Sequence, residues 1–144
     1  MEAAGEWHLS RMLFPGLKGA AVLDLGRGYG WHSKYVVDCG AVSVLGIDLS
    51  ERMIAEAIQK NADEKITYKV IGLEEYDYPA NTYDCVIANL VVHYIKDLNT
   101  IYERVYSTLR VSGVFLFNIE HPVFTAGISE DWVYDTDGKS QYWR

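Results

Sequence analysis

The sequence predicts an α/β fold: a Rossmann-like, doubly wound sheet of about five mostly parallel strands, flanked by helices. Short apolar runs alternate with segments of helical period, which is typical of parallel strands joined by right-handed crossover helices. A turn with three glycines follows the first apolar run, and an aspartate ends the second. Ligands of such open sheets bind beyond the carboxyl ends of the strands, so these two features are expected to meet at one site.

Each strand is predicted from an apolar run bounded by turn residues. The first run ends in glycine, and Pro79, Ala80 and Asn81 turn the chain before the fourth run. Gly113 precedes the fifth run. The five predicted strands cover residues 20–26, 42–48, 66–71, 83–89 and 114–119.

At least three crossover helices are predicted between these strands. Trp31, Tyr35 and Cys39 recur at helical spacing after the glycine turn, and Gly40 occupies the position of a left-handed C-terminal cap. The second helix is expected to begin after Ser50 as N-cap and to carry Met53, Ile54, Ala57 and Ile58 on one face. The third is expected to begin after Asp97 and to carry Leu98, Ile101, Tyr102, Val105 and Leu109.

Length and composition indicate a single domain over residues 1–144, with a core at 20–122. The chain has neither a secretory signal nor an apolar run of about 20 residues, so a cytoplasmic location and no membrane partner are expected. The net charge of -7 disfavours a nucleic-acid partner, because such partners need clustered Lys and Arg. The negative charge is equally consistent with a cationic substrate and with a role in solubility alone. Residues 123–144 form an aromatic tail without a clean period and are expected to be loop.

Cys39 and Cys85 lie far apart and have no metal-ligand spacing. Both are therefore expected to be buried free thiols, and no metal site is predicted.

The glycine turn, residues 24–30 (Asp-Leu-Gly-Arg-Gly-Tyr-Gly), brings main-chain N–H groups close to a ligand. A nicotinamide enzyme is the rival interpretation, since its Gly-x-Gly-x-x-Gly loop also follows a strand. Its third glycine would fall at Trp31, however, and Asp24 would repel a pyrophosphate while suiting an ammonium group. The pattern therefore favours a different nucleoside ligand.

Asp48 ends the second predicted strand, 18 residues after Gly30. That strand lies beside the first in a doubly wound sheet, so the carboxylate can accept both hydroxyls of a ribose held over the glycine turn. Capping of the next helix is the alternative role, but Ser50 already suits it.

Four segments of the chain resemble the class I S-adenosylmethionine-dependent methyltransferases, in particular the small-molecule branch called methyltransferase type 11. They are residues 22–30 (VLDLGRGYG), 46–53 (GIDLSERM), 83–94 (YDCVIANLVVHY) and 113–122 (GVFLFNIEHP). All four occur in order and at suitable spacing. The resemblance implies methyl transfer from S-adenosylmethionine to a small molecule, with S-adenosylhomocysteine as product.

The resemblance also implies a role for each matching residue. The loop of Gly26, Arg27, Gly28 and Gly30 would hold the methionine end of the donor, with Asp24 at its amino group, while Asp48 would hold the ribose. The adenine would lie between Leu49 and Met53, near the backbone of Gly72 and Leu73, with Glu74 accepting its exocyclic amine. Asn89 and Leu90 would line the sulfonium and the path of the methyl group.

The roles of the residues near the methyl acceptor are left open by the sequence. His93 is a candidate general base, because neutral imidazole can take a proton near pH 7, and packing within its loop is the alternative. Glu120, His121 and Pro122 either face the substrate or shape the turn. Candidates for lining the acceptor pocket are Trp7, His8, Trp31, Trp132 and Tyr134.

The chain departs from the family at two places that matter for function. Arg27 stands where Cys, Ala or Ser is common, and it either pairs with the donor's carboxylate or crowds the pocket. Family members usually add a helix and an antiparallel pair of strands after the fifth strand, which this chain is expected to lack. Its fifth strand would then be an open edge, covered by the aromatic tail or by a second copy in a homodimer. The alternative function is a truncated, donor-binding protein or partner subunit.

Overall fold

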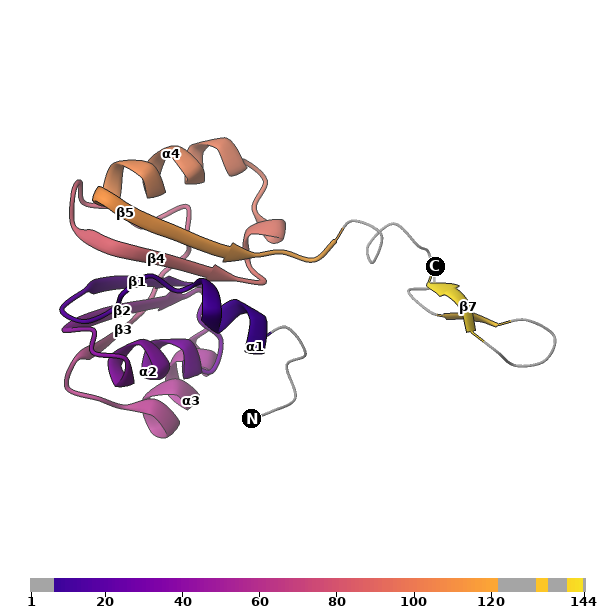
Figure 1. Ribbon diagram of the computed structural model, residues 1–144, viewed down its shortest axis with the longest axis horizontal. Coiled ribbons are helices and arrows are strands. Elements are labelled where there is room, and N and C mark those ends of the chain that lie inside the picture. The colour runs from indigo at the N-terminus through magenta and orange to yellow at the C-terminus, as the bar shows by residue number, and fades with distance from the viewer. Residues whose placement is uncertain (1–6, 122–131, 135–139, 144) are drawn as a thin grey trace.

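The computed structural model describes residues 7–121, 132–134 and 140–143. Five parallel strands form one sheet in the order β3-β2-β1-β4-β5 (Figure 1). They are β1 (Ala21–Leu25), β2 (Ser43–Asp48), β3 (Ile66–Val70), β4 (Tyr83–Asn89) and β5 (Leu109–Asn118). The predicted doubly wound sheet is confirmed. The strand order reverses between β1 and β4, which is where such sheets bind ligands.

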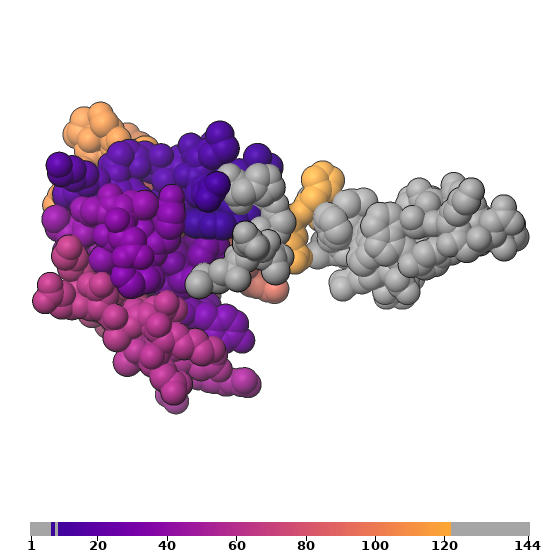
Figure 2. Space-filling model, turned by 60° about the horizontal axis from the view of Figure 1, so that its bottom comes forward, coloured from indigo at the N-terminus to yellow at the C-terminus, as the bar shows by residue number. Residues whose placement is uncertain are grey.

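Helices cover both faces of the sheet. Helices α2 (Trp31–Asp38) and α3 (Glu51–Asn61) follow β1 and β2, and α4 (Leu98–Thr108) joins β4 to β5. Right-handed crossovers running in opposite directions from β1 and β4 place α2 and α3 on one face and α4 on the other. Figure 2 shows the α2 and α3 side as a closed surface in violet and magenta.

The core has two halves because successive strand residues point to opposite faces. Leu23 and Leu25 of β1 pack with Ile101 and Val105 of α4. Val22, the residue before Leu23, packs on the other face among residues that include Val36 of α2. Each strand of the sheet's centre is thus buried on both sides, as its continuous apolar run predicts.

The predicted helix caps are confirmed. Ser50 Oγ accepts a hydrogen bond from the Met53 N–H at 3.3 Å, and Asp97 Oδ1 accepts one from the Thr100 N–H at 3.2 Å. Gly40 has φ of 100° directly after the α2 C-cap, in the region where other residues are strained.

One helix face and one thiol differ from the prediction. The buried residues of α2 include His32, Ser33 and Val36, whereas Tyr35 is only partly buried and Cys39 is exposed. The prediction of a buried thiol is therefore wrong for Cys39 and right for Cys85. The reason is that two polar residues, His32 and Ser33, occupy the face that packs on the sheet, which hydrophobic periodicity alone does not reveal.

Several boundaries also differ. Strand β5 begins at Leu109, not at residue 114, and its register against β4 shifts between Tyr83 and Cys85. Ser112, with φ of 66°, lies within β5, where a turn before the strand was expected. Two short strands, β6 (Trp132–Tyr134) and β7 (Ser140–Trp143), pair antiparallel in a sheet of their own, within the segment expected to be loop.

The N-terminal helices α1 (Trp7–Ser10) and η1 (Arg11–Leu13) precede the sheet, and η2 (Val92–Tyr94) follows β4. Strand β5 is the last strand of the main sheet, so one of its sides is an edge among the described residues. Within the same residues, we find no helix with the length and apolar character that spanning a membrane requires.

Candidate cofactor-binding site

The glycine turn between β1 and α2 is the first component of the site. Gly26, Gly28 and Gly30 have φ values of 60°, 52° and 79°, a region that other residues adopt only with strain. Gly26 is also enclosed, because a Cβ there would lie 2.2 Å from Val91 Cγ2 in the loop after β4. The turn and the end of β4 therefore touch, and only glycine permits this contact.

Asp48, the last residue of β2, joins the glycine turn to the start of α3. Its Oδ2 accepts a hydrogen bond from the Gly28 N–H at 3.0 Å, and its Oδ1 accepts one from the Ser50 N–H at 2.9 Å. The residue is partly exposed. Because a carboxylate offers about four acceptor positions, both oxygens keep capacity for a further bond. Ser50 is the N-cap of α3, so Asp48 remains available for a diol.

The N-terminus of α2 lies directly after the turn. The Lys34 N–H donates to the Gly30 carbonyl at 3.2 Å. The Ser33 N–H hydrogen-bonds to the Asp24 carboxylate, whereas the N–H groups of Trp31 and His32 have no carbonyl within the helix to pair with. Such N–H groups, together with the partial positive charge of a helix N-terminus, suit a ligand carboxylate.

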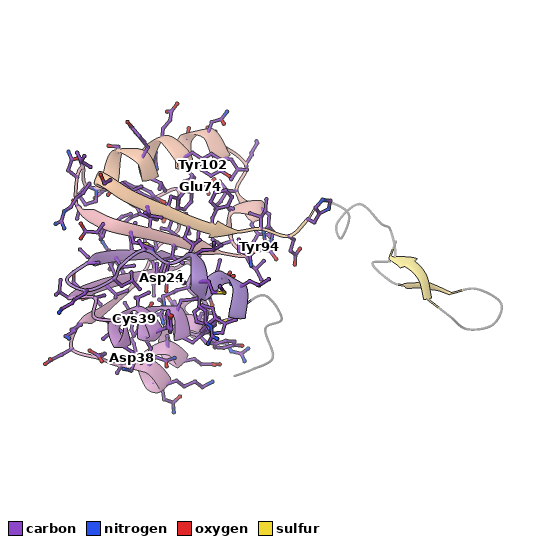
Figure 3. All side chains as sticks on the ribbon, in the orientation of Figure 1. Asp24, Asp38, Cys39, Glu74, Tyr94 and Tyr102 are labelled. Carbon is purple, nitrogen blue, oxygen red and sulfur yellow. The ribbon has the colours of Figure 1, made fainter. Side chains whose placement is uncertain are left out.

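Polar side chains buried beneath the turn support it. Asp24 is 1% exposed and accepts a hydrogen bond from Ser33 Oγ at 2.6 Å. Burial raises the pKa of Asp24 to about 6. Figure 3 shows Asp24 within the domain. The role predicted for Asp24 at a ligand's amino group needs an accessible carboxylate, and this geometry does not offer one.

Arg27 occupies the same buried layer. Its guanidinium lies 3.5 Å from the centre of the Tyr68 ring, and burial lowers its pKa. The side chain passes between two glycines: a Cβ on Gly30 would lie 1.8 Å from Nη2, and one on Gly46 would lie 2.5 Å from Cδ. Within the described residues, its nitrogens have no hydrogen-bond partner. The structure thus folds Arg27 beneath the turn instead of toward a ligand carboxylate or into a pocket.

An apolar surface lies beside Asp48. Leu49 is 72% exposed, and a Cβ on Gly72 would lie 3.6 Å from its Cδ1. Met53, one turn into α3, is partly buried. The Ile71 N–H donates to the Asp48 carbonyl at 3.0 Å, which holds the end of β3 against that of β2. A flat heterocycle can lie against these side chains while Asp48 holds an attached sugar.

Of the two residues after Gly72, Leu73 lies in the core and Glu74 lies at the surface. Leu73 is 6% exposed and belongs to the core cluster under α4, so its side chain is not available to a ligand. Glu74 is exposed, and its carbonyl accepts a hydrogen bond from Arg104 Nη1 at 2.6 Å.

A family model described as a methyltransferase domain matches residues 23–117. The chain belongs to this methyltransferase family. The solved structure of a candidate S-adenosylmethionine-dependent methyltransferase from Listeria monocytogenes is 42% identical, with a TM-score of 0.90 over 99% of this chain and 67% of that one. An S-adenosylmethionine-dependent methyltransferase from Mesorhizobium loti is 35% identical, with a TM-score of 0.82 over 86% of this chain and 57% of that one.

A curated relative is phosphoethanolamine N-methyltransferase 2 of Caenorhabditis elegans. It is 31% identical over 104 residues, which are 70% of this chain and 24% of that protein. This methyltransferase chain spans less than half the length of the curated relatives that it matches first. The predicted family, fold class and cofactor, S-adenosylmethionine, are confirmed, and the nicotinamide alternative is rejected.

The residues of this methyltransferase site fit its cofactor. Asp48 offers a partly exposed carboxylate for the ribose, beside the apolar surface of Leu49 for the adenine. The N–H groups at the start of α2 suit the carboxylate of the methionine end. The described residues contain no group of three or more potential metal ligands.

The end of β4 lies beside the glycine turn, where Val91 meets Gly26. Leu90 has φ of 52°, and its N–H donates to the Asn118 carbonyl of β5 at 2.9 Å. Both ring nitrogens of His93 are buried and have no hydrogen-bond partner within the described residues. The His93 ring packs on Tyr94 with centroids 4.2 Å apart. Figure 3 shows Tyr94 at the end of the sheet toward which β5 points.

A small cavity of about 20 Å³ lies beside this end of the methyltransferase sheet. His32 of α2 and Asn89 of β4 belong to its wall, as does Trp7 of α1. The remaining lining residues are Ser10, Phe14, Ile87, Ala88, Leu116, Phe117 and Asn118. The cavity is therefore formed by the N-terminal segment, α2, β4 and β5.

Sequence reasoning found part of this wall and missed its most buried polar member. Trp7, a candidate for the acceptor pocket, lines this cavity, and Trp31 stacks on His32 with ring centroids 3.7 Å apart. The side chains of His8, Trp132 and Tyr134 lie outside the described residues. His32 was not singled out, although a histidine directly after a glycine turn and at the start of a helix is a signal that could have marked it.

Proposed function

We propose that this domain binds S-adenosylmethionine at the glycine turn and transfers its methyl group to a small molecule. The partly exposed Asp48 carboxylate carries the proposal, because it is tied to the turn through the Gly28 N–H and keeps capacity for a ribose diol. Leu49 and Met53 flank the adenine, Gly72 and Leu73 contact it through their backbone, and Glu74 accepts its exocyclic amine.

Each remaining residue of the turn has a part in this proposal. Gly26, Gly28 and Gly30 hold the methionine end, and their positive φ values give the turn its shape. Arg27 and Asp24 support the turn from beneath. Arg27 packs on the Tyr68 ring, and Asp24 accepts a hydrogen bond from Ser33. We assign Asp24 no direct contact with the amino group, because its carboxylate is buried.

The chemistry needs alignment more than a dedicated reactive side chain. When bound, the cofactor supplies an electrophilic methyl group on its sulfonium. Asn89 and Leu90 confine the space next to it, and the contact of Val91 with Gly26 keeps the end of β4 beside the turn. Holding two reactants in line contributes much of the acceleration in such reactions. His93 is a candidate base for an acceptor that must lose a proton.

The acceptor is proposed to be a small metabolite. The phosphoethanolamine N-methyltransferases among the relatives support this class, and the net charge of -7 argues against a nucleic acid. A cytoplasmic location remains part of the proposal on the sequence evidence alone.

We also propose a homodimer through the edge of β5. An apolar groove of about 280 Å³ runs between α4 and this edge and is lined by Tyr102, Val105, Tyr106, Leu109, Phe115 and Phe117. Exposed apolar surface beside unpaired strand backbone favours pairing with another chain. A partner subunit that binds the donor without transferring its methyl group is the second candidate function.

Calorimetric titration with S-adenosylhomocysteine tests the donor site. Binding in a one-to-one ratio is expected, and an absence of binding would overturn the proposal. Single-turnover assays with labelled donor and a metabolite panel that includes phosphoethanolamine then test transfer. Donor binding without transfer to any acceptor would favour the second candidate function.

A further inference from the structure

The cavity beside β4 has the size of one small polar group. Its volume of about 20 Å³ slightly exceeds the roughly 10–15 Å³ that a water molecule needs. Trp7, Phe14 and Phe117 belong to its wall, as do Asn89 and Asn118 at the ends of β4 and β5. The wall contains no Lys, Arg, Asp or Glu.

His32 is the most buried polar side chain of this wall. It is 6% exposed and stacks on Trp31, with ring centroids 3.7 Å apart. Within the described residues, the side chains of His32, Asn89 and Asn118 have no hydrogen-bond partner. Burial lowers the pKa of His32 to about 4, so its imidazole is neutral near pH 7 and offers one acceptor nitrogen.

We propose that this cavity binds the amino group of a small amine, the methyl acceptor, and that His32 accepts one of its hydrogen bonds. The inference rests on the proposed function, since Asn89 also lies next to the space assigned to the donor's methyl group. His32 has not been assigned a role by the sequence pattern.

Three features of the wall favour an amine over a hydroxyl. An amino group donates two or three hydrogen bonds, which matches the acceptors on His32, Asn89 and Asn118, whereas a hydroxyl donates one. Aromatic residues such as Trp7 and Phe14 attract the positive charge of the arriving ammonium, which releases one proton to solvent before its nitrogen lone pair takes the methyl group. A neutral His32 adds no charge that would repel the ammonium.

Binding to the protein saturated with S-adenosylhomocysteine tests the inference. The probes are ethanolamine and ethylene glycol, which differ in the amino group alone. Ethanolamine is expected to bind with a millimolar dissociation constant, as suits so small a ligand, and to shift the NMR signals of the His32 ring. Ethylene glycol is expected to bind at least about tenfold more weakly.

His32→Phe and Tyr35→Phe make a matched pair of variants on α2. Phenylalanine keeps a ring against Trp31 but removes the acceptor nitrogen, whereas Tyr35 contacts Trp7 without lining the cavity. H32F should weaken ethanolamine binding about tenfold, the loss of one net hydrogen bond of about 1.4 kcal/mol. Y35F should leave it unchanged.

The outcomes separate this inference from the donor site. Equal ethanolamine affinities of wild type and folded H32F, equal affinities for the two probes, or no shift of the His32 signals would each overturn the amine site. Loss of S-adenosylhomocysteine binding in the wild type would instead overturn the proposed function. Circular dichroism and donor titration of H32F check its fold, and replacement by Asn (H32N), which restores an acceptor, should recover part of the ethanolamine affinity.

Discussion

The Gly28 N–H donates a hydrogen bond to Oδ2 of Asp48 at 3.0 Å, which ties the glycine turn after β1 to the carboxyl end of β2. The same carboxylate receives the Ser50 N–H through Oδ1. One side chain thus orders the turn, the start of α3 and the face proposed to hold a ribose. This shared use makes Asp48 the most informative position to alter.

Asp48→Ala should weaken S-adenosylhomocysteine binding at least tenfold. The variant loses the acceptors for a ribose diol and releases the Gly28 N–H, and hydrogen bonds to a charged group contribute about 1.5–3 kcal/mol each. Asp48→Asn keeps one acceptor oxygen, so its affinity should lie between those of the wild type and of Asp48→Ala. Calorimetry measures all three affinities, and a D48A affinity equal to that of the wild type would refute the ribose assignment.

Gly26→Ala should destabilise the domain more than Gly28→Ala does. Both positions have positive φ, so both variants are strained by about 1–2 kcal/mol. Only at Gly26 would the new Cβ also meet a neighbour, Val91 Cγ2 at 2.2 Å, whereas nothing lies within 4 Å of it at Gly28. Urea unfolding compares the two. Equal losses of unfolding free energy would show that the β4 loop does not press on the turn.

Asp24 and His32 should make opposite contributions to stability between pH 4 and 6. The pKa of Asp24 is raised from 3.8 to about 6 on folding, so its contribution to stability is present below pH 3.8 and lost as pH rises through 6. The pKa of His32 falls from 6.5 to about 4, so its contribution is present above pH 6.5 and lost as pH falls through 4.

Single variants should separate these two contributions, each about 3 kcal/mol. The free energy of unfolding of Asp24→Asn, relative to the wild type, should rise as pH increases from 4 to 6. That of His32→Phe, relative to the wild type, should fall over the same range. Urea unfolding at several pH values gives both differences, and a flat difference would mean that the group titrates alike in the folded and unfolded chain.

The two thiols should differ in reactivity. Cys39 is exposed, whereas Cys85 is buried and burial raises its pKa to about 12. Because the thiolate is the reactive form, an alkylating reagent at neutral pH should modify Cys39 alone in the folded protein and both residues in urea. Mass spectrometry identifies the modified residue. Rapid labelling of Cys85 in the native protein would show that the sheet opens readily.

Charged substitutions at the β5 edge should prevent the proposed dimer. Val111 is 94% exposed and Tyr106 is 84% exposed beside the apolar groove. Val111→Lys combined with Tyr106→Glu should shift the mass measured by light scattering from dimer to monomer. These residues lie away from Asp48, so donor affinity should not change. A wild-type protein that is monomeric at every concentration would contradict the dimer.

Much of the fold was predictable because each strand is a continuous apolar run and each helix has a local signal. Ser50 and Asp97 act as the predicted caps, since capping depends only on residues three positions apart. The start of β5 was missed because the strand continues through Ser112 despite its positive φ, with a shift of register against β4. Pairing between distant segments is not encoded in either segment alone.

The sequence by itself determined the strands, the glycine turn and the aspartate that ends β2, since these depend on local pattern and on the short distance between neighbouring strands. Only the tertiary structure decided the environments of Arg27 and His32. Arg27 lies over Tyr68, 41 positions later, and His32 shares a cavity wall with residues of β4 and β5. Burial and long-range contact arise from the packing of remote segments, and these set which polar groups stay neutral, unpaired or available to a ligand.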